Sequence, residues 1–100
     1  MEADYLDLAF RGELWHWRGP APFYFITVSD DASAALHAVS TEVTYGWGMI
    51  PVRARIGGTL FDTSLFPKDG RYVLPVKDAV RMAERLAAGD TVAVQLVIRQ

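Results

Sequence analysis

The side chains best suited to recognising a ligand in this chain are its three tryptophans, Trp15, Trp17 and Trp47. Trp15 and Trp17 alternate along a predicted strand and share a face with Arg11 and Glu13, whereas the main apolar residues of that strand fall on the other face. A rigid indole loses little entropy on binding, so this pair predicts a groove for a small ligand or a peptide. The alternative is that the pair forms a second core face. Trp47, flanked by two glycines, is expected near the same end of the fold.

A second group of residues with chemical potential is basic. Lys77, Arg81 and Arg85 are spaced at i, i+4 and i+8 of a predicted helix, and Arg53 and Arg55 alternate on a predicted strand. Together these side chains predict a basic stripe able to contact phosphate groups. The competing interpretation is a solvated helix face, because runs of charge usually mark solvent-exposed surfaces.

Catalytic chemistry has little support in the sequence. His16 and His37 are the only histidines, there is no cysteine, and no metal-ligand spacing such as HxH or HExxH occurs. Ser64 lacks the GxSxG context of an activated nucleophile, so we interpret it as a strand hydroxyl. We therefore expect no metal site and no cofactor, and we rank an enzyme last among three function classes.

Composition and charge narrow the class of protein. The chain has 100 residues, 51% hydrophobic and 22% charged, which is typical of one folded domain spanning residues 1–100. Residues 1–50 hold two basic and seven acidic residues (−5) and residues 51–100 hold eight basic and five acidic (+3), which sum to −2. The acidic first half argues against a general nucleic-acid binder. Because no apolar run reaches the roughly 20 residues of a membrane span and the start does not resemble a secretory signal, we expect a cytoplasmic protein.

The spacing of apolar residues predicts six strands and two helices. A helix begins at residue 29 or 30, runs to 39 and gives way to a polar linker at 40–42. A second helix spans 78–87, ends at Gly89, and is expected to bury Ala79, Val80, Ala83, Leu86 and Ala87. Gly12 predicts a bulge, and Pro75 excludes an interior strand position at that point. The predicted strands are 6–16, 23–28, 50–56, 59–66, 72–76 and 92–98.

The strand–helix unit occurs twice. Residues 24–39 and 72–87 match at a constant offset of 48 (72 − 24), so that Tyr24 aligns with Tyr72 and Ile26 with Leu74. Two copies in one chain indicate pseudo-twofold halves. Short strands in this number predict a closed or nearly closed barrel with helices over its openings. The fold class we expect is mainly β, a six-stranded barrel capped by two short helices and closed within one chain.

Two patterns resemble known families. The run GRYVLP (70–75), then a helix, then AGDTVAV (88–94) resembles the repeat unit of swapped-hairpin transition-state regulators and antitoxins. Nearly the whole chain is similar to the bacterial domain-of-unknown-function family nineteen-oh-five. This second resemblance implies a double-split β-barrel with helical caps and assigns no reaction. The segments that carry it are ELWHW (13–17), GWGMIPV (46–52), IGG (56–58), TSLFP (63–67) and LPVK (74–77).

These observations favour a non-catalytic module that binds a small molecule or a protein partner through Trp15, Trp17 and Trp47. A nucleic-acid-binding regulator resembling the swapped-hairpin proteins is the second class and would use the basic stripe. Because the first half is acidic, we expect nucleic acid to be an unlikely partner, and we expect no association with membranes. The protein should be a monomer, or a surface-packed dimer without obligatory strand exchange.

Overall fold

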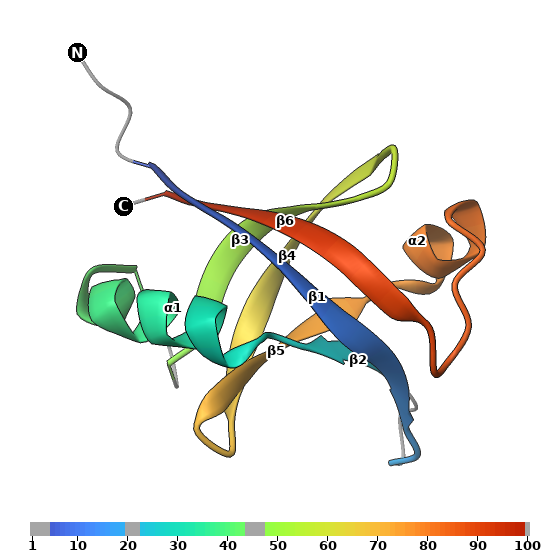
Figure 1. Cartoon of the computed structure of the whole chain (residues 1–100), viewed down its shortest axis with the longest axis horizontal. Helices are drawn as coiled ribbons and strands as arrows, with labels where there is room; N and C mark the ends of the chain where they lie inside the picture. The colour runs from blue at the N-terminus through green and yellow to red at the C-terminus, as the bar shows by residue number, and fades with distance from the viewer. Residues whose placement is uncertain (1–4, 20–22, 44–47, 100) are drawn as a thin grey trace.

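The computed structural model describes residues 5–19, 23–43 and 48–99 (Figure 1). Within these ranges the chain forms six strands and two helices, as its apolar spacing predicts. In chain order the elements are β1 (Tyr5–Trp17), β2 (Phe23–Thr27), α1 (Asp30–Val43), β3 (Ile50–Ile56), β4 (Thr59–Lys68), β5 (Arg71–Val76), α2 (Asp78–Ala83) and β6 (Thr91–Arg99).

The strands close into an antiparallel barrel in the order β1-β2-β5-β4-β3-β6, which confirms the predicted fold class. Two long strands each serve two neighbours. β1 pairs with β6 over 5–13 and then with β2 over 14–17. β4 pairs with β3 over 59–65 and then with β5 over 66–68. The barrel therefore consists of two β-β-α-β halves with matching connectivity, in agreement with the repeat in the sequence.

The core fills the barrel interior. β3 shows the pattern most clearly, because Ile50, Val52, Ala54 and Ile56 point inward and are buried while the residues between them are exposed. This period of two is what a strand with one solvated face requires. The largest fully buried side chains are Leu14, Ile26, Val28, Leu36, Ile50, Leu65, Leu74, Val94, Leu96 and Ile98.

The first helix lies at one end of the barrel, and α2 lies at the other (Figure 1). Ser29 caps α1, because its hydroxyl oxygen accepts a hydrogen bond from the Ala32 N–H at 3.4 Å. Leu36 anchors α1 against the core. The polar linker predicted at 40–42 is wrong, since α1 continues to Val43. The Ser40 hydroxyl donates to the His37 carbonyl at 2.9 Å, so this residue is satisfied inside the helix and does not end it.

The second helix is shorter than predicted. It ends at Ala83, because Arg85 takes a left-handed conformation (φ 54°) and the Leu86 N–H donates back to the Arg81 carbonyl at 2.9 Å. These are the features of a Schellman C-cap, with arginine where glycine is usual. The next residues are held by the barrel, since the Gly89 N–H donates to the Leu14 carbonyl at 2.8 Å.

The predicted burial along this helix is correspondingly wrong. Val80 is its one buried residue, and Leu86 lies beyond the helix, half-buried against the core. A six-residue helix turns too few side chains toward the barrel to bury a longer stripe. The predicted core positions that are exposed instead are Ala79, Ala83 and Ala87.

Two special positions in the strands behave differently. Pro75 has a strand neighbour on one side only: it lies opposite Phe25, whereas the pairing of β5 with β4 runs only from Arg71 to Val73. The predicted restriction at Pro75 is therefore confirmed. The bulge predicted at Gly12 is wrong, because the β1–β6 register runs through Gly12 without an extra residue. Gly12 is instead a point of close approach, where an added Cβ would lie 2.6 Å from the Thr27 carbonyl oxygen.

Candidate functional site: an aromatic sheet face

The outward side of β1, β2, β5 and β4 carries aromatic rings where a solvated sheet normally carries polar residues. We call this surface the aromatic face and define it by Trp15, Trp17, Phe23, Phe25 and Phe66. Strand register brings them together, since Trp15 lies opposite Phe25 and Trp17 lies opposite Phe23. Phe66 belongs to the same surface because its partner Val73 is on β5, and β5 lies between β4 and β2 in the sheet.

The rings of the aromatic face contact one another across the strands. Trp15 and Phe25 have centroids 5.1 Å apart, and Phe25 and Phe66 meet edge to face at 6.2 Å. Trp17 and Phe23 are nearly parallel, with 6° between their planes and 6.3 Å between their centroids. Such cross-strand pairs stabilise a sheet and hold each ring in a fixed orientation.

Exposure divides these rings into a buried layer and an outer layer. Phe25 is buried and Trp15 is half-buried, with its indole N–H donated to the Thr27 hydroxyl at 3.0 Å. Trp17, Phe23 and Phe66 keep 45%, 49% and 39% of their surface exposed. The face is therefore partly a second core layer and partly an open apolar surface, so each of the two interpretations of the tryptophan pair describes part of it. Trp47 lies outside the described residues.

The edge of the aromatic face beside α2 carries a shallow depression of about 380 Å³. Phe23 and Pro75 extend the face into it, and Lys77 stands at its border. Aromatic surface and a cation therefore border the same depression. The remaining lining residues are Tyr24, Thr63, Val76 and Asp78.

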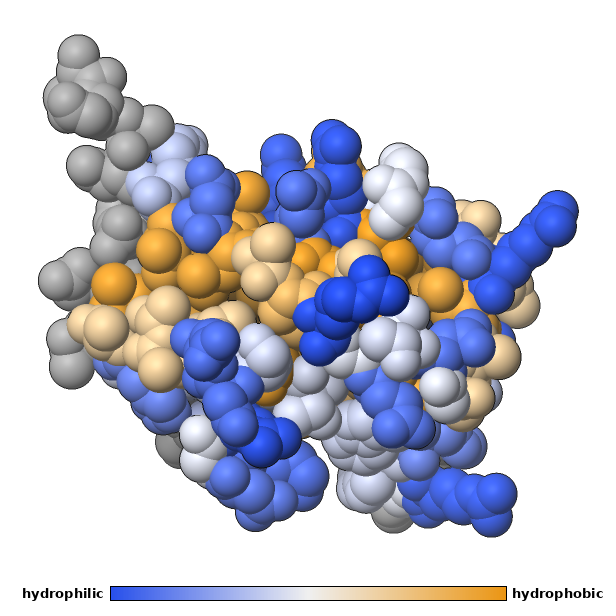
Figure 2. All heavy atoms as spheres, in the orientation of Figure 1, coloured by the Kyte–Doolittle hydropathy of each residue, from blue (hydrophilic) through white to orange (hydrophobic). Residues whose placement is uncertain are grey.

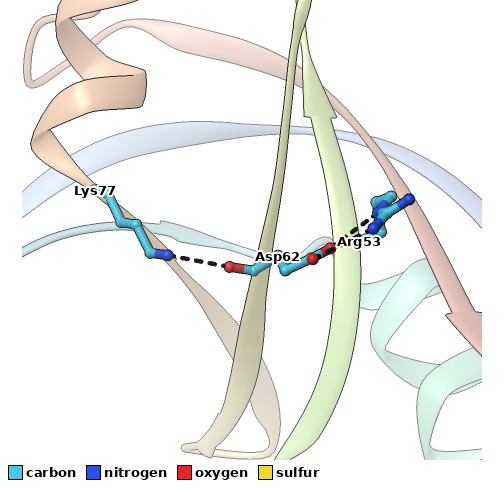
Figure 3. Close-up of polar contacts among 3 residues, drawn as sticks. All are labelled: Arg53, Asp62 and Lys77. Atoms are coloured by element: carbon cyan, nitrogen blue, oxygen red, sulfur yellow. Dashed lines mark hydrogen bonds and ion pairs between the residues drawn. The ribbon is translucent and has the colours of Figure 1, made fainter.

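A polar network lies next to this edge (Figure 3). Arg53 donates two hydrogen bonds to the Asp62 carboxylate, at 2.9 Å from Nε and 3.3 Å from Nη2. Lys77 Nζ donates to the main-chain carbonyl of Asp62 at 3.3 Å. The hydrogen bonds from Arg53 lower the pKa of Asp62 below its ordinary value, and the same contact raises the pKa of Arg53.

The basic stripe predicted along one helix is wrong in its geometry. α2 ends at Ala83, so Arg85 lies outside the helix and cannot continue the i, i+4 series from Lys77 and Arg81. Arg81 lies over the Tyr24 ring, with its guanidinium carbon 4.4 Å from the ring centroid. Its Nη2 contacts the Asp78 carboxylate at 3.4 Å, and its buried Nε has no hydrogen-bond partner in the described part of the chain.

A second outer surface lies over β6 and the part of β1 that pairs with it, residues 5–13. Figure 2 views this side and shows a band of hydrophobic residues across the middle, bordered by hydrophilic side chains. Arg55 belongs to this side, where it borders a shallow depression of about 440 Å³ together with Arg11. Arg53 and Arg55 lie on the outward face of β3, as the alternation in that strand predicts. The other residues that line the depression are Ala9, Phe10, Gly57, Ala93, Val94 and Gln95.

The histidines lie in separate aromatic contacts. His16 lies 4.7 Å from the Tyr24 ring, and His37 lies 5.1 Å from the Tyr72 ring, centroid to centroid. Among residues 5–19, 23–43 and 48–99, no group of three or more histidine, cysteine, aspartate or glutamate side chains is arranged to hold a metal ion. Ser64 is half-buried on β4.

Sequence reasoning missed the part that phenylalanines play in this surface. The sequence pattern predicts that Phe23 and Phe25 lie in a strand, but it points only to the tryptophans as residues of a groove. The available signal is that β2 is apolar on both faces, since its inward residues are Tyr24 and Ile26. Phe66 gave no comparable signal, because only the pairing of β4 with β5 brings it to the face.

Comparison with known proteins agrees with the resemblance seen in the sequence. No curated protein matches the chain. Within the described residues, neither helix is long and apolar enough to cross a membrane. The family model described as "Domain of unknown function (DUF1905)" matches residues 10–96, which is most of the chain. The closed barrel with two short helices also agrees with the fold which that resemblance implies. The chain therefore belongs to the DUF1905 family.

Proposed function

We propose that this domain is a non-catalytic protein-binding module and that a segment of a partner protein docks on the aromatic face. The observation that carries the proposal is the exposure of three rings, Trp17, Phe23 and Phe66, which are at least 39% open to solvent and are linked by contacts with Phe25. Clustered apolar exposure of this kind is uncommon on a surface with no partner, and it marks interaction sites.

The rigidity of the surface supports the same function. Trp17 and Phe23 stand on paired strands and hold each other nearly parallel, so docking requires little ordering of the binding site. Preorganised aromatic side chains make effective anchors because little conformational entropy is lost when they are covered.

The shape of the surface favours a protein segment over the other ligands. Small molecules usually bind in concave pockets that enclose most of their surface, whereas these rings stand on an open sheet. Nucleic acid requires several cations available to phosphate. Here Arg71 pairs with Asp30 at 2.6 Å and Arg53 pairs with Asp62, so these two arginines are already engaged.

A peptide-display selection tests the function directly. The full chain is immobilised and screened with a random peptide library, and the Trp17→Ala/Phe66→Ala double variant serves for counter-selection. We expect peptides with apolar residues that prefer the wild-type protein, and binding should protect tryptophan fluorescence from acrylamide. Leu60→Ala is the matched control, since Leu60 is also exposed on β4 but precedes the segment of β4 that pairs with β5. If the folded double variant retains the same peptides as the wild type, the aromatic face is not the binding site.

A further inference from the structure

The two ends of the aromatic face differ in charge. At the end formed by β4 and β5, the charges are paired: Arg71 contacts Asp30 at 2.6 Å and Lys68 contacts Asp69 at 3.7 Å. These four residues therefore leave no surplus charge at this end for a docked segment to contact.

At the end beside α2, one cation is left over. The Asp62 carboxylate is occupied by Arg53, and the Asp78 carboxylate is contacted by Arg81. Lys77 directly precedes Asp78 in the chain and is exposed, and its ammonium group donates to the main-chain carbonyl of Asp62 (Figure 3). Among the described residues, no carboxylate lies within ion-pair distance of Lys77, although its charge helps to lower the pKa of Asp62. The two carboxylates at this end already pair with Arg53 and Arg81, so the positive charge of Lys77 is in excess.

The position of this charge relates it to the aromatic face. Lys77 directly follows β5 and borders the depression of about 380 Å³ that Phe23 and Pro75 line. A chain lying over Phe23 would place its next side chain in or beside this depression. Arg18, which follows Trp17, is exposed and makes no ion pair with described residues, so it adds positive charge near the end of β1.

We infer that the docked segment is an apolar peptide with an acidic side chain at one end, and that this carboxylate lies over Lys77. The inference rests on the proposed function. It adds which side chains the docked segment carries and which end of the segment lies at Lys77. Apolar residues would cover Trp17, Phe23 and Phe66, while the carboxylate would pair with the exposed ammonium group of Lys77. Rim charges of this kind select partners and fix their register more than they add affinity.

The same display selection shows which side chains the docked peptide needs, once the enriched peptide sequences are aligned. We expect Asp or Glu at one side of the apolar residues. A synthetic copy of the enriched peptide is then titrated against three folded proteins: wild type, Lys77→Gln and Lys68→Gln. Lys77→Gln should weaken binding about two- to five-fold, as for an exposed ion pair, and this difference should shrink at high salt. Lys68→Gln, at the opposite end of the face, should bind as the wild type does.

The outcomes separate the two proposals. Enriched peptides that are apolar but lack acidic residues would overturn the inference and leave the docking function intact. Equal affinity of Lys77→Gln and Lys68→Gln for an acidic peptide would also overturn it, because the carboxylate would then pair elsewhere. A selection that yields no peptide specific for the aromatic face overturns both.

Discussion

Ile26 and Leu74 lie directly opposite each other in the β2–β5 pairing, and neither has any exposed surface. Their numbers differ by 48 (74 − 26), which is the offset of the repeated strand–helix unit. Each residue is thus paired with its own equivalent in the other half. The pseudo-twofold axis of the barrel passes between these two side chains, and the two halves meet in the core at this point.

The first prediction concerns this central contact. Leu74→Ala should lower the free energy of unfolding by about 2–5 kcal/mol, because it removes a fully buried side chain and leaves a cavity. Urea unfolding followed by circular dichroism measures the change. Leu60→Ala is the control and should change stability by about 0.5 kcal/mol or less, since Leu60 is 54% exposed. Equal effects from the two substitutions would contradict the assigned core.

The second prediction tests the close approach at Gly12. An added Cβ would lie 2.6 Å from the Thr27 carbonyl oxygen and 2.8 Å from Ile26 Cγ2, so the strands must move apart. Gly12→Ala should therefore destabilise the protein by about 1–3 kcal/mol, as overpacking does.

Gly58→Ala is the matched control for Gly12→Ala. Its added Cβ meets no atom within 4 Å, and Gly58 does not adopt a positive φ. The same urea titration applied to both variants gives the comparison. A Gly12→Ala protein as stable as Gly58→Ala would show that β1 and β2 are not held as tightly as the structure indicates.

The third prediction concerns alkaline stability. Burial raises the pKa of Tyr72 above its ordinary value, since the side chain is 2% exposed. The folded state therefore holds this proton at a pH where the unfolded state releases it. Its contribution to stability is complete below the unfolded pKa of about 10 and is lost as pH rises through the folded pKa.

Tyr72→Phe should consequently reduce the loss of stability that urea unfolding records above about pH 10, where unfolded tyrosine ionises. Tyr24→Phe is the control, because Tyr24 is the equivalent residue in the other half but is only half-buried. If Tyr72→Phe and the wild type lose stability in parallel at high pH, the Tyr72 hydroxyl titrates as it does in the unfolded chain.

The fourth prediction tests the contact between Arg53 and Asp62. Because the pKa of Asp62 is lowered in the folded state, its stabilising effect is present above the unfolded pKa of about 4 and is lost as pH falls through the folded pKa. A carboxyl titration followed by NMR should place the Asp62 pKa below its ordinary value. Arg53→Gln should raise it toward that value, whereas Arg55→Gln should leave it nearly unchanged. No response to Arg53→Gln would exclude the hydrogen bonds as the cause.

Much of the fold was predictable because strand patterns are local. The alternation from Ile50 to Ile56 predicts both the strand and its buried face, and β3 has those bounds and that burial. The repeat at an offset of 48 predicted pseudo-twofold halves, and the pairing of Ile26 with its equivalent Leu74 agrees with that prediction. The exposed Trp17 could be anticipated because it falls on the strand face away from Leu14.

The end of α2 and the composition of the aromatic face depended on tertiary structure. The periodicity after Asp78 continues to residue 87, but the Gly89 N–H bonds to the Leu14 carbonyl, and this distant contact holds the chain after the helix. Phe66 meets Phe25 only because β5 lies between their strands.

By itself, the sequence determined the strands, their inward residues and the family of this protein, because these depend on local periodicity and on short motifs. Tertiary structure decided which side chains from different strands became neighbours. Trp17, Phe23 and Phe66 form one surface, and Lys77 keeps its surplus charge because Arg53 occupies Asp62. Both outcomes follow from pairing between segments far apart in the chain, which the spacing of residues within a single segment does not specify.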